Sequence, residues 1–172
     1  MSYTLYDATV VLARDSLNSL TAILKKGEAA PNAASLPGAR IHDDMKPLTF
    51  QVHVACDLSN KVYARMTGQE PPKTEDELKT FADMHARIAQ TLQLLAKADR
   101  EAINKRVGEK VPVGLGPGKE AQISSLGYTN GYALPNIFFH VTTAYNILRK
   151  EGVPLGKMDY LKPFLGQYVP DL

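Results

Sequence analysis

Four long segments of this 172-residue chain repeat apolar residues at spacings of three and four, and no other feature restricts the fold as much. On a helix, that spacing collects apolar side chains on one face, which has to be buried against another element. Four such amphipathic helices predict an all-α protein built as a four-helix bundle. At this length we expect a single domain over residues 1–172.

The first two helices have recognisable boundary signals. Thr4 with Asp7 resembles a capping box, which predicts a first helix over residues 5–26. The second helix is predicted to begin at the aspartates of residues 43–44, where a carboxylate can cap free N–H groups. It is predicted to end at Gly68.

The third helix is predicted to start after the Pro71-Pro72 pair, where Thr74 and Glu77 form a capping box, and to run to about residue 96. The earlier loop over residues 29–41 has no apolar period. Its length would permit a crossover connection in place of a simple up-down order of helices.

A short β-hairpin is expected before the last helix. Val111 and Val113 alternate with other residues, as do Ala121 and Ile123, and the intervening residues 114–118 are rich in glycine. Two strands are not stable alone. The hairpin should therefore lie over one end of the bundle.

The last long helix is predicted to begin between residues 127 and 130 and to end at Gly152, with Pro135 either kinking it or marking its start. The C-terminal tail, residues 153–172, is partly apolar. We expect it to be extended and to pack back on the bundle or on a second subunit. Three prolines interrupt this tail: Pro154, Pro163 and Pro170.

Polar residues run beside two of the predicted apolar faces. On the last helix, Asn136 and His140 are four residues apart and so point the same way. Such a pair can hold a ligand or a metal, or can simply hydrogen-bond with neighbouring helices. A polar row on the second helix is expected to form half of a polar cleft, and its members are Thr49, His53, Cys56, Asp57 and Asn60.

Charge and cysteine content narrow the class of protein. The 20 basic and 18 acidic residues are well mixed, which gives no reason to expect nucleic-acid binding. Cys56 is the single cysteine, so no internal disulfide forms, and a reducing compartment is compatible with the chain. The longest early apolar run, residues 10–13, is too short for a membrane span or a signal peptide. We expect a cytoplasmic protein without membrane contact.

Three segments carry a resemblance to a known family. They read RIHDDMKPLTFQVHVACD at residues 40–57, PNIFFHVTTAYNIL at residues 135–148 and GVPLGKMDYL at residues 152–161. In this order they resemble the family called domain of unknown function nineteen-ninety-three, which belongs to the DinB/YfiT-like superfamily of four-helix bundles. The resemblance covers nearly the whole chain and implies that fold.

The resemblance also implies where a metal would bind. Many superfamily members hold a divalent metal with three histidines, one on the second helix and two, four residues apart, on the last. His53 and His140 fall at two of these positions, but the third is Asn136, and an amide is a weak ligand for zinc or nickel. We therefore expect no cofactor and no tightly held metal. If a metal binds, His53 and His140 are its expected ligands.

The preferred hypothesis is a pocket inside the bundle for a small apolar or aromatic compound. His140 and His53 are expected to act as acid/base groups, with Asp57 orienting the ring of His53. Such chemistry suits a cofactor-independent isomerase, dehydratase or cyclase. The residues expected to contact the ligand are Asn136, Gln51, Tyr132, His85 and Tyr145.

Two alternative functions stay open. One is a divalent-metal-dependent transferase or hydrolase of the DinB-like type, and the other is a non-catalytic association module. The apolar stripe of the third helix and the apolar tail also predict a homodimer. Cys56 is expected to be a small apolar residue of a helix interior and not a nucleophile.

Overall fold

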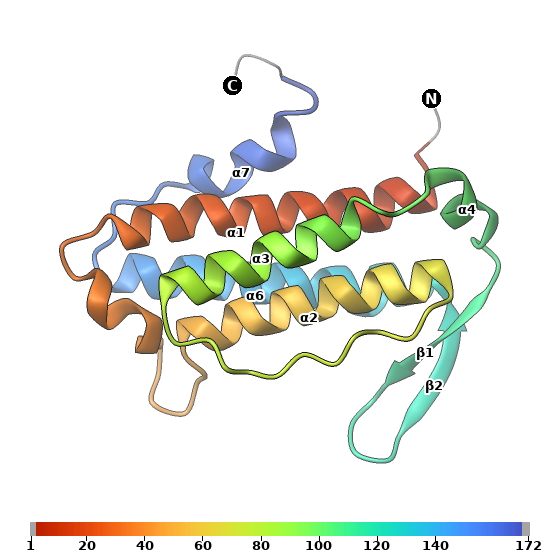
Figure 1. Ribbon diagram of the computed structural model, residues 1–172, viewed down its shortest axis with the longest axis horizontal. Helices are drawn as coiled ribbons and strands as arrows, with labels where there is room; N and C mark the ends of the chain where they lie inside the picture. Colours follow the sequence, from red (N-terminus) through yellow and green to blue (C-terminus); the bar gives the residue numbers. More distant parts are fainter. Residues whose placement is uncertain (1–2, 170–172) are drawn as a thin grey trace.

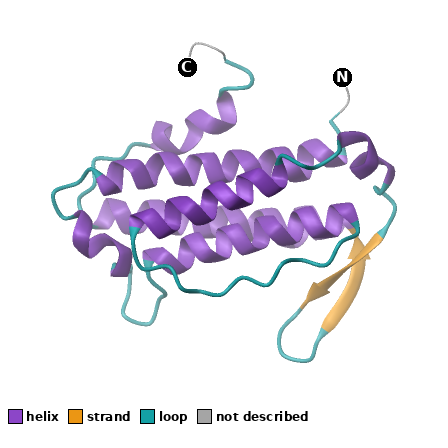
Figure 2. Ribbon diagram, in the orientation of Figure 1, coloured by secondary structure: helices purple, strands orange, loops and turns teal. Residues whose placement is uncertain are grey.

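Four long helices dominate the computed structural model, which describes residues 3–169 (Figures 1 and 2). Their buried apolar side chains form one core, in which Leu17, Leu20, Met84 and Ile137 are fully enclosed. The predicted four-helix bundle is confirmed. Its helices are α1 (Leu12–Glu28), α2 (Leu48–Thr67), α3 (Phe81–Leu95) and α6 (Leu134–Lys150).

The crossover connection lies between α2 and α3. These two helices run in the same direction, opposite to α1 and α6, so the chain must return along the bundle before α3 begins (Figure 1). Residues 69–80 make this return without forming a helix or strand, and we call them the strap. The loop at residues 29–41, whose length would permit a crossover, does not provide it. That loop contains a 3₁₀ helix, Ala33–Gly38, and joins neighbouring ends of α1 and α2.

The predicted start of α2 is also wrong. The helix begins at Leu48, because Pro47 before it has an extended backbone with ψ of 175°. The aspartates of residues 43–44 therefore lie in the preceding turns and cap no helix. The predicted end is correct: Gly68 terminates α2 with a φ of 73°, a left-handed conformation that favours glycine.

The start of α3 differs from the prediction by about six residues. Thr80 and Asp83 form the capping box, with the Thr80 N–H donating to Asp83 Oδ2 at 2.9 Å and the Asp83 N–H donating to Thr80 Oγ1 at 3.1 Å. Thr74 lies in the strap and donates its hydroxyl to Asp57 of α2 at 3.2 Å. A carboxylate from a distant helix therefore engages the residue expected to cap α3.

The N-terminal helical region begins as predicted. The Thr4 N–H and hydroxyl both donate to Asp7 Oδ2, at 3.1 and 2.6 Å. A π-helical turn, Asp7–Val11, leads directly into α1. The helix extends to Glu28, so Gly27 lies inside its last turn and packs closely against Phe81 and Leu148.

The predicted hairpin lies at the end of the bundle where α2 ends (Figure 1). A short helix, α4 (Arg100–Lys105), precedes strands β1 (Lys110–Gly114) and β2 (Glu120–Ser124), which pair antiparallel. Val111 and Val113 are buried, and Arg65 of α2 donates to the Pro112 carbonyl at 3.1 Å. These contacts hold the hairpin against the helices.

Helical structure resumes immediately after β2. A short helix, α5 (Ser125–Tyr128), and a π-helical turn, Thr129–Ala133, continue into α6. Pro135 lies in the first turn of α6, directly after the π-helical turn, and has no N–H to donate to a carbonyl of that turn. Helical backbone therefore starts slightly before the predicted range.

The C-terminal tail was expected to be extended, but it contains a nine-residue helix, α7 (Lys157–Leu165). This helix lies across α1 (Figure 1). The centroid of its Phe164 ring is 6.1 Å from that of the Phe138 ring on α6. Lys26 of α1 pairs with Asp159 at 2.8 Å. The tail thus packs on its own bundle, while Pro170 and the two residues after it lie outside the described residues.

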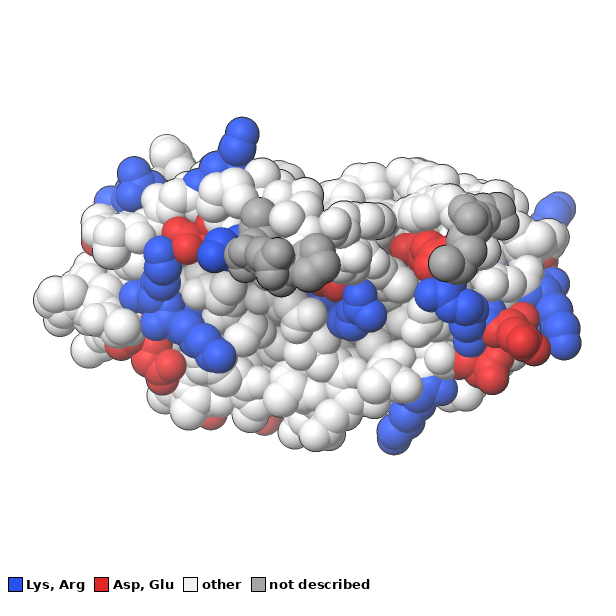
Figure 3. Space-filling model, turned by 90° about the horizontal axis from the view of Figure 1, so that it is seen from above, with Lys and Arg blue, Asp and Glu red and all other residues white. Residues whose placement is uncertain are grey.

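Surface charge is mixed on the face that carries α7, where basic and acidic side chains are interspersed among neutral ones (Figure 3). Within residues 3–169, no helix combines the length and the apolar character needed to cross a membrane.

Candidate functional site

Helix α2 presents two different flanks to its neighbours. Gln51 and Leu58 are seven residues apart and lie on the flank facing α6, since Gln51 contacts His140. His53 and Asn60 have the same spacing and lie on the flank facing α3 and the strap, since His53 contacts Arg87 of α3. We call these the α6 flank and the α3 flank.

On the α6 flank, a chain of hydrogen bonds fixes the imidazole of His140. Gln51 is 3% exposed, and its Nε2 donates to the Lys46 carbonyl at 2.9 Å. The Gln51 Oε1 is thereby oriented as an acceptor, 2.8 Å from His140 Nδ1. Neutral His140 then carries its proton on Nδ1. The lone pair on Nε2 is left for an external partner.

Two aromatic rings lie beside this histidine. Phe50 and Phe139 lie with their ring centroids 6.3 and 5.3 Å from that of His140, both edge-on. Burial lowers the pKa of His140 below its ordinary value. The imidazole is therefore neutral at pH 7. Phe139 is 58% exposed, so an apolar surface lies beside a neutral nitrogen base.

On the α3 flank, His53 and Asp57 belong to a different network. Arg87 donates from Nη1 to His53 Nδ1 at 3.3 Å and from Nη2 to the Glu75 carbonyl of the strap at 3.1 Å. Asp57 pairs with Lys61 at 2.6 Å and accepts from Thr74. Asp57 therefore holds the strap, and no bond joins it to His53.

The structure does not bring His53 and His140 to a shared partner. Phe50 is adjacent to both, 6.3 Å from each imidazole between ring centroids. One member of the polar row of α2, Asn60, lines a cavity whose other walls are α3 and the strap. Helix α6 contributes no residue to this cavity.

The other predicted ligand residues are dispersed. Tyr132 packs on Tyr128 near the hairpin, at 5.7 Å between centroids. Tyr145 lines a cavity of 320 Å³ between α6 and α7. His85 stacks on Phe81, and its Nε2 is 3.3 Å from Glu28 Oε2 without a hydrogen-bonding orientation. Asn136 is half-buried on α6, one turn before His140.

Cys56 is fully buried among apolar residues, as predicted. Burial raises the pKa of its thiol to about 12, so the thiolate is not formed at neutral pH. This position suits core packing.

The arrangement of these residues does not fit a three-histidine metal centre. Within residues 3–169, no three histidine, cysteine, aspartate or glutamate side chains gather closely enough to hold one ion. The Nδ1 of His53 faces the guanidinium of Arg87, which would repel a metal cation. Of His53 and His140, His140 has the better geometry for a ligand, because Gln51 holds its Nδ1 and its Nε2 is available.

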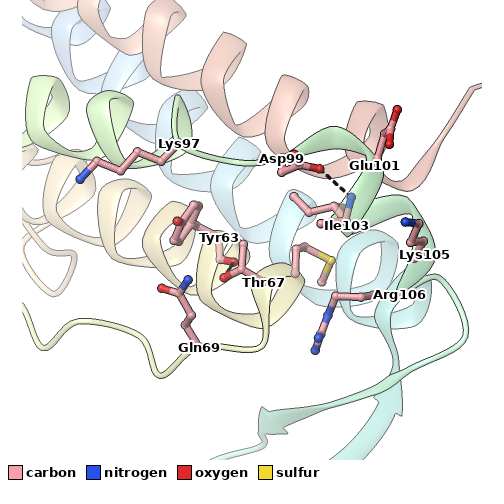
Figure 4. A pocket seen from close by; sticks show the side chains of 11 residues that line it. Tyr63, Thr67, Gln69, Lys97, Asp99, Glu101, Ile103, Lys105 and Arg106 are labelled. Carbon is pink, nitrogen blue, oxygen red and sulfur yellow. Dashed lines mark hydrogen bonds between the residues drawn. The ribbon is translucent and has the colours of Figure 1, made fainter.

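A cavity of 660 Å³ at the far end of α2 is a weaker candidate (Figure 4). Asp99 is occupied in capping α4, with its Oδ1 accepting from the Ala102 N–H at 2.7 Å. The side chains of Lys97 and Lys105 lie on opposite sides of the cavity and do not converge (Figure 4). Both signs of charge line it, so it has no clear preference for a ligand.

Comparison with known proteins agrees with this fold. A DinB family member protein from Shewanella denitrificans has a solved structure that is 35% identical to this chain, with a TM-score of 0.81 over 91% of each chain. The bundle is therefore of the DinB-like class. A family model described as "Domain of unknown function (DUF1993)" matches residues 5–161, and the chain belongs to this family. No curated protein matches the chain.

Two residues of the site escaped prediction. Arg87 joins His53 to the strap, and Phe50 lies beside both histidines. Nothing in the apolar period distinguishes Arg87 from other charged residues on α3. Phe50 follows the core residue Leu48 by two positions, which places it off the buried face and gave no reason to select it.

Proposed function

We propose that this protein binds a small aromatic or apolar compound on the α6 flank, and that neutral His140 removes a proton from it. The observation that carries the proposal is the hydrogen-bond chain from the Lys46 carbonyl through Gln51 to His140 Nδ1. It holds one tautomer and leaves Nε2 as the base. Proton abstraction from carbon or oxygen begins isomerisations, dehydrations and cyclisations, and none of these needs a cofactor.

Two features support an aromatic or apolar ligand. The exposed ring of Phe139 and the half-buried ring of Phe50 offer flat apolar surface next to the base. Lys46 Nζ lies 5.7 Å from the centroid of the Phe50 ring, so a cation borders the same surface. A ring stacked here would place a polar substituent near either His140 or Lys46.

The proposal is tested first by binding. Titration with phenol, indole and benzoate, followed by NMR of the His140 and Phe139 ring signals, should give saturable shifts with at least one of the three. Phe139→Ser should abolish them, whereas the matched control Phe164→Ser on α7 should not. Absence of saturable shifts at these two rings with all three compounds would contradict the proposed site.

The second test is of the base. In D₂O, a bound compound with an acidic C–H should exchange that hydrogen faster in the presence of the protein. His140→Gln should remove this acceleration, by at least about 100-fold, if His140 is the general base. His85→Gln is the control and should leave the rate unchanged. Full exchange in the His140 variant would assign the base elsewhere.

Metal-dependent transfer or hydrolysis of the DinB-like type is the competing function, because His140 Nε2 is as suitable for a metal as for a proton. Elemental analysis of untagged protein distinguishes the two. A transition metal at one equivalent, lost on His140→Ala, would replace our proposal. Less than about one-tenth of an equivalent, with binding unaffected by chelator, would remove the alternative.

We also propose that the chain forms a homodimer, and association alone is the third candidate function. The tail no longer supports this idea, since α7 packs on α1 of the same chain. The exposed Phe139 supports it, because an apolar side chain in solvent gains by burial. Analytical ultracentrifugation at micromolar concentration should show twice the monomer mass. A monomeric mass throughout would refute it.

A further inference from the structure

A cavity lies on the side of α2 opposite to Gln51 and His140. It has a volume of 320 Å³, within the range of small-ligand sites, and is bounded by α2, α3 and the strap. Thr74 and Pro72 of the strap cover it, and Thr74 is held in place by its bond to Asp57. This cavity is independent of the site proposed for the histidine base.

The side chains lining this cavity favour an anion. Arg87 and Lys97 contribute two cations, and none of the nine lining residues, all of them described, is acidic. The carboxylate that contacts the strap there, Asp57, is already paired with Lys61. Arg87 uses two of its five N–H groups on His53 and Glu75, so three remain. Gln90 and Gln93 add amide groups.

Asn60 offers a ligand an oxygen atom that lacks a hydrogen-bond donor. Its side chain is 5% exposed, yet its Oδ1 has no hydrogen-bond partner among the described residues. A buried carbonyl oxygen without a partner is unfavourable, and such groups are rare in folded proteins. A ligand hydroxyl that donates to this amide would satisfy it.

We propose that this cavity binds a small hydroxycarboxylate, with the carboxylate on Arg87 and Lys97 and the hydroxyl on Asn60. A charged carboxylate accepts strong hydrogen bonds from guanidinium and ammonium groups. The hydroxyl supplies the donor that Asn60 lacks. The strap would border such a ligand, because Thr74 bonds to Asp57 of α2 and the Glu75 carbonyl bonds to Arg87 of α3.

Malate and succinate form a matched pair for the test, since they differ by one hydroxyl. Both are titrated at constant ionic strength and followed by the side-chain amide signals of Asn60, Gln90 and Gln93. Malate should bind saturably and about tenfold more tightly than succinate, as one buried hydrogen bond allows. Equal binding of the two, or no saturation with either, would overturn the proposal.

Two variants test which residues contact the carboxylate and the hydroxyl of the ligand. Lys97→Gln should weaken both compounds several-fold, and because Lys97 is exposed the variant will fold. Asn60→Ala should reduce malate binding to the level of succinate. Lys162→Gln on α7 is the control and should change neither affinity. Malate binding that survives both Lys97→Gln and Asn60→Ala would place the ligand elsewhere and refute the site.

Discussion

The two flanks of α2 belong to one helix, but their polar residues meet different partners. The α6 flank packs helix against helix, and its Gln51 holds the neutral, half-buried His140 of α6. The α3 flank is widened by the strap, so its polar groups meet cations and a cavity. The comparison shows that a polar row along a helix has no function of its own. The neighbouring segment decides which partners each polar group meets.

The largest difference between the flanks should appear in stability. Leu58→Ala on the α6 flank removes a side chain that is 3% exposed and should lower the free energy of unfolding by about 2–5 kcal/mol. Asn60→Ala on the α3 flank should cost less than about 1 kcal/mol, because it also removes an unpaired oxygen. Urea denaturation measures both. Equal losses would mean that the flanks are packed alike.

The next comparison concerns the pKa of His140. Gln51→Glu places a carboxylate where an amide oxygen now accepts from Nδ1, and should raise the pKa of His140 by about 1–3 units. Asp57→Asn on the α3 flank should leave it unchanged. NMR titration of the His140 ring measures this directly. A shift caused by the Asp57 variant would show that the flanks communicate through Phe50.

Two threonine variants test whether the strap and α3 are separate elements. Thr80→Ala removes the observed capping box and should destabilise the protein by about 1 kcal/mol. Thr74→Ala breaks only a part-exposed bond to Asp57 and should cost about half as much or less. Thermal unfolding distinguishes them. If Thr74→Ala has the larger effect, α3 begins in the strap, as the sequence suggested.

The smallest expected effect is on the pH dependence of stability. The pKa of His140 is lower in the folded protein than in the unfolded chain, so the unfolded chain binds more protons as the pH falls through its own pKa, near 6.5. Stability should therefore fall between about pH 7 and pH 5, and His140→Gln should make the decline shallower. His42→Gln, at an exposed position, is the control. An unchanged slope in the His140 variant would show that its burial has no energetic weight.

The sequence by itself determined the helices and their buried faces. The apolar face of α2, from Leu48 through Val52 to Met66, is enclosed in the core, and Gly68 ends the helix as predicted. Apolar period and glycine conformation act within a few residues of each other, so local sequence is sufficient to reveal them. The family resemblance identified the class of helix bundle. It did not identify the residue that contacts any side chain of the site.

Only the tertiary structure decided the site. Thr80 caps α3 and Thr74 does not, because Asp57, 17 residues from Thr74, engages the latter. His53 meets Arg87 across 34 residues of sequence, and His140 meets Gln51 across 89. The orientation of each histidine ring depends on these partners. Pairing between distant segments follows from how the helices pack, and periodicity within a single helix carries no record of it.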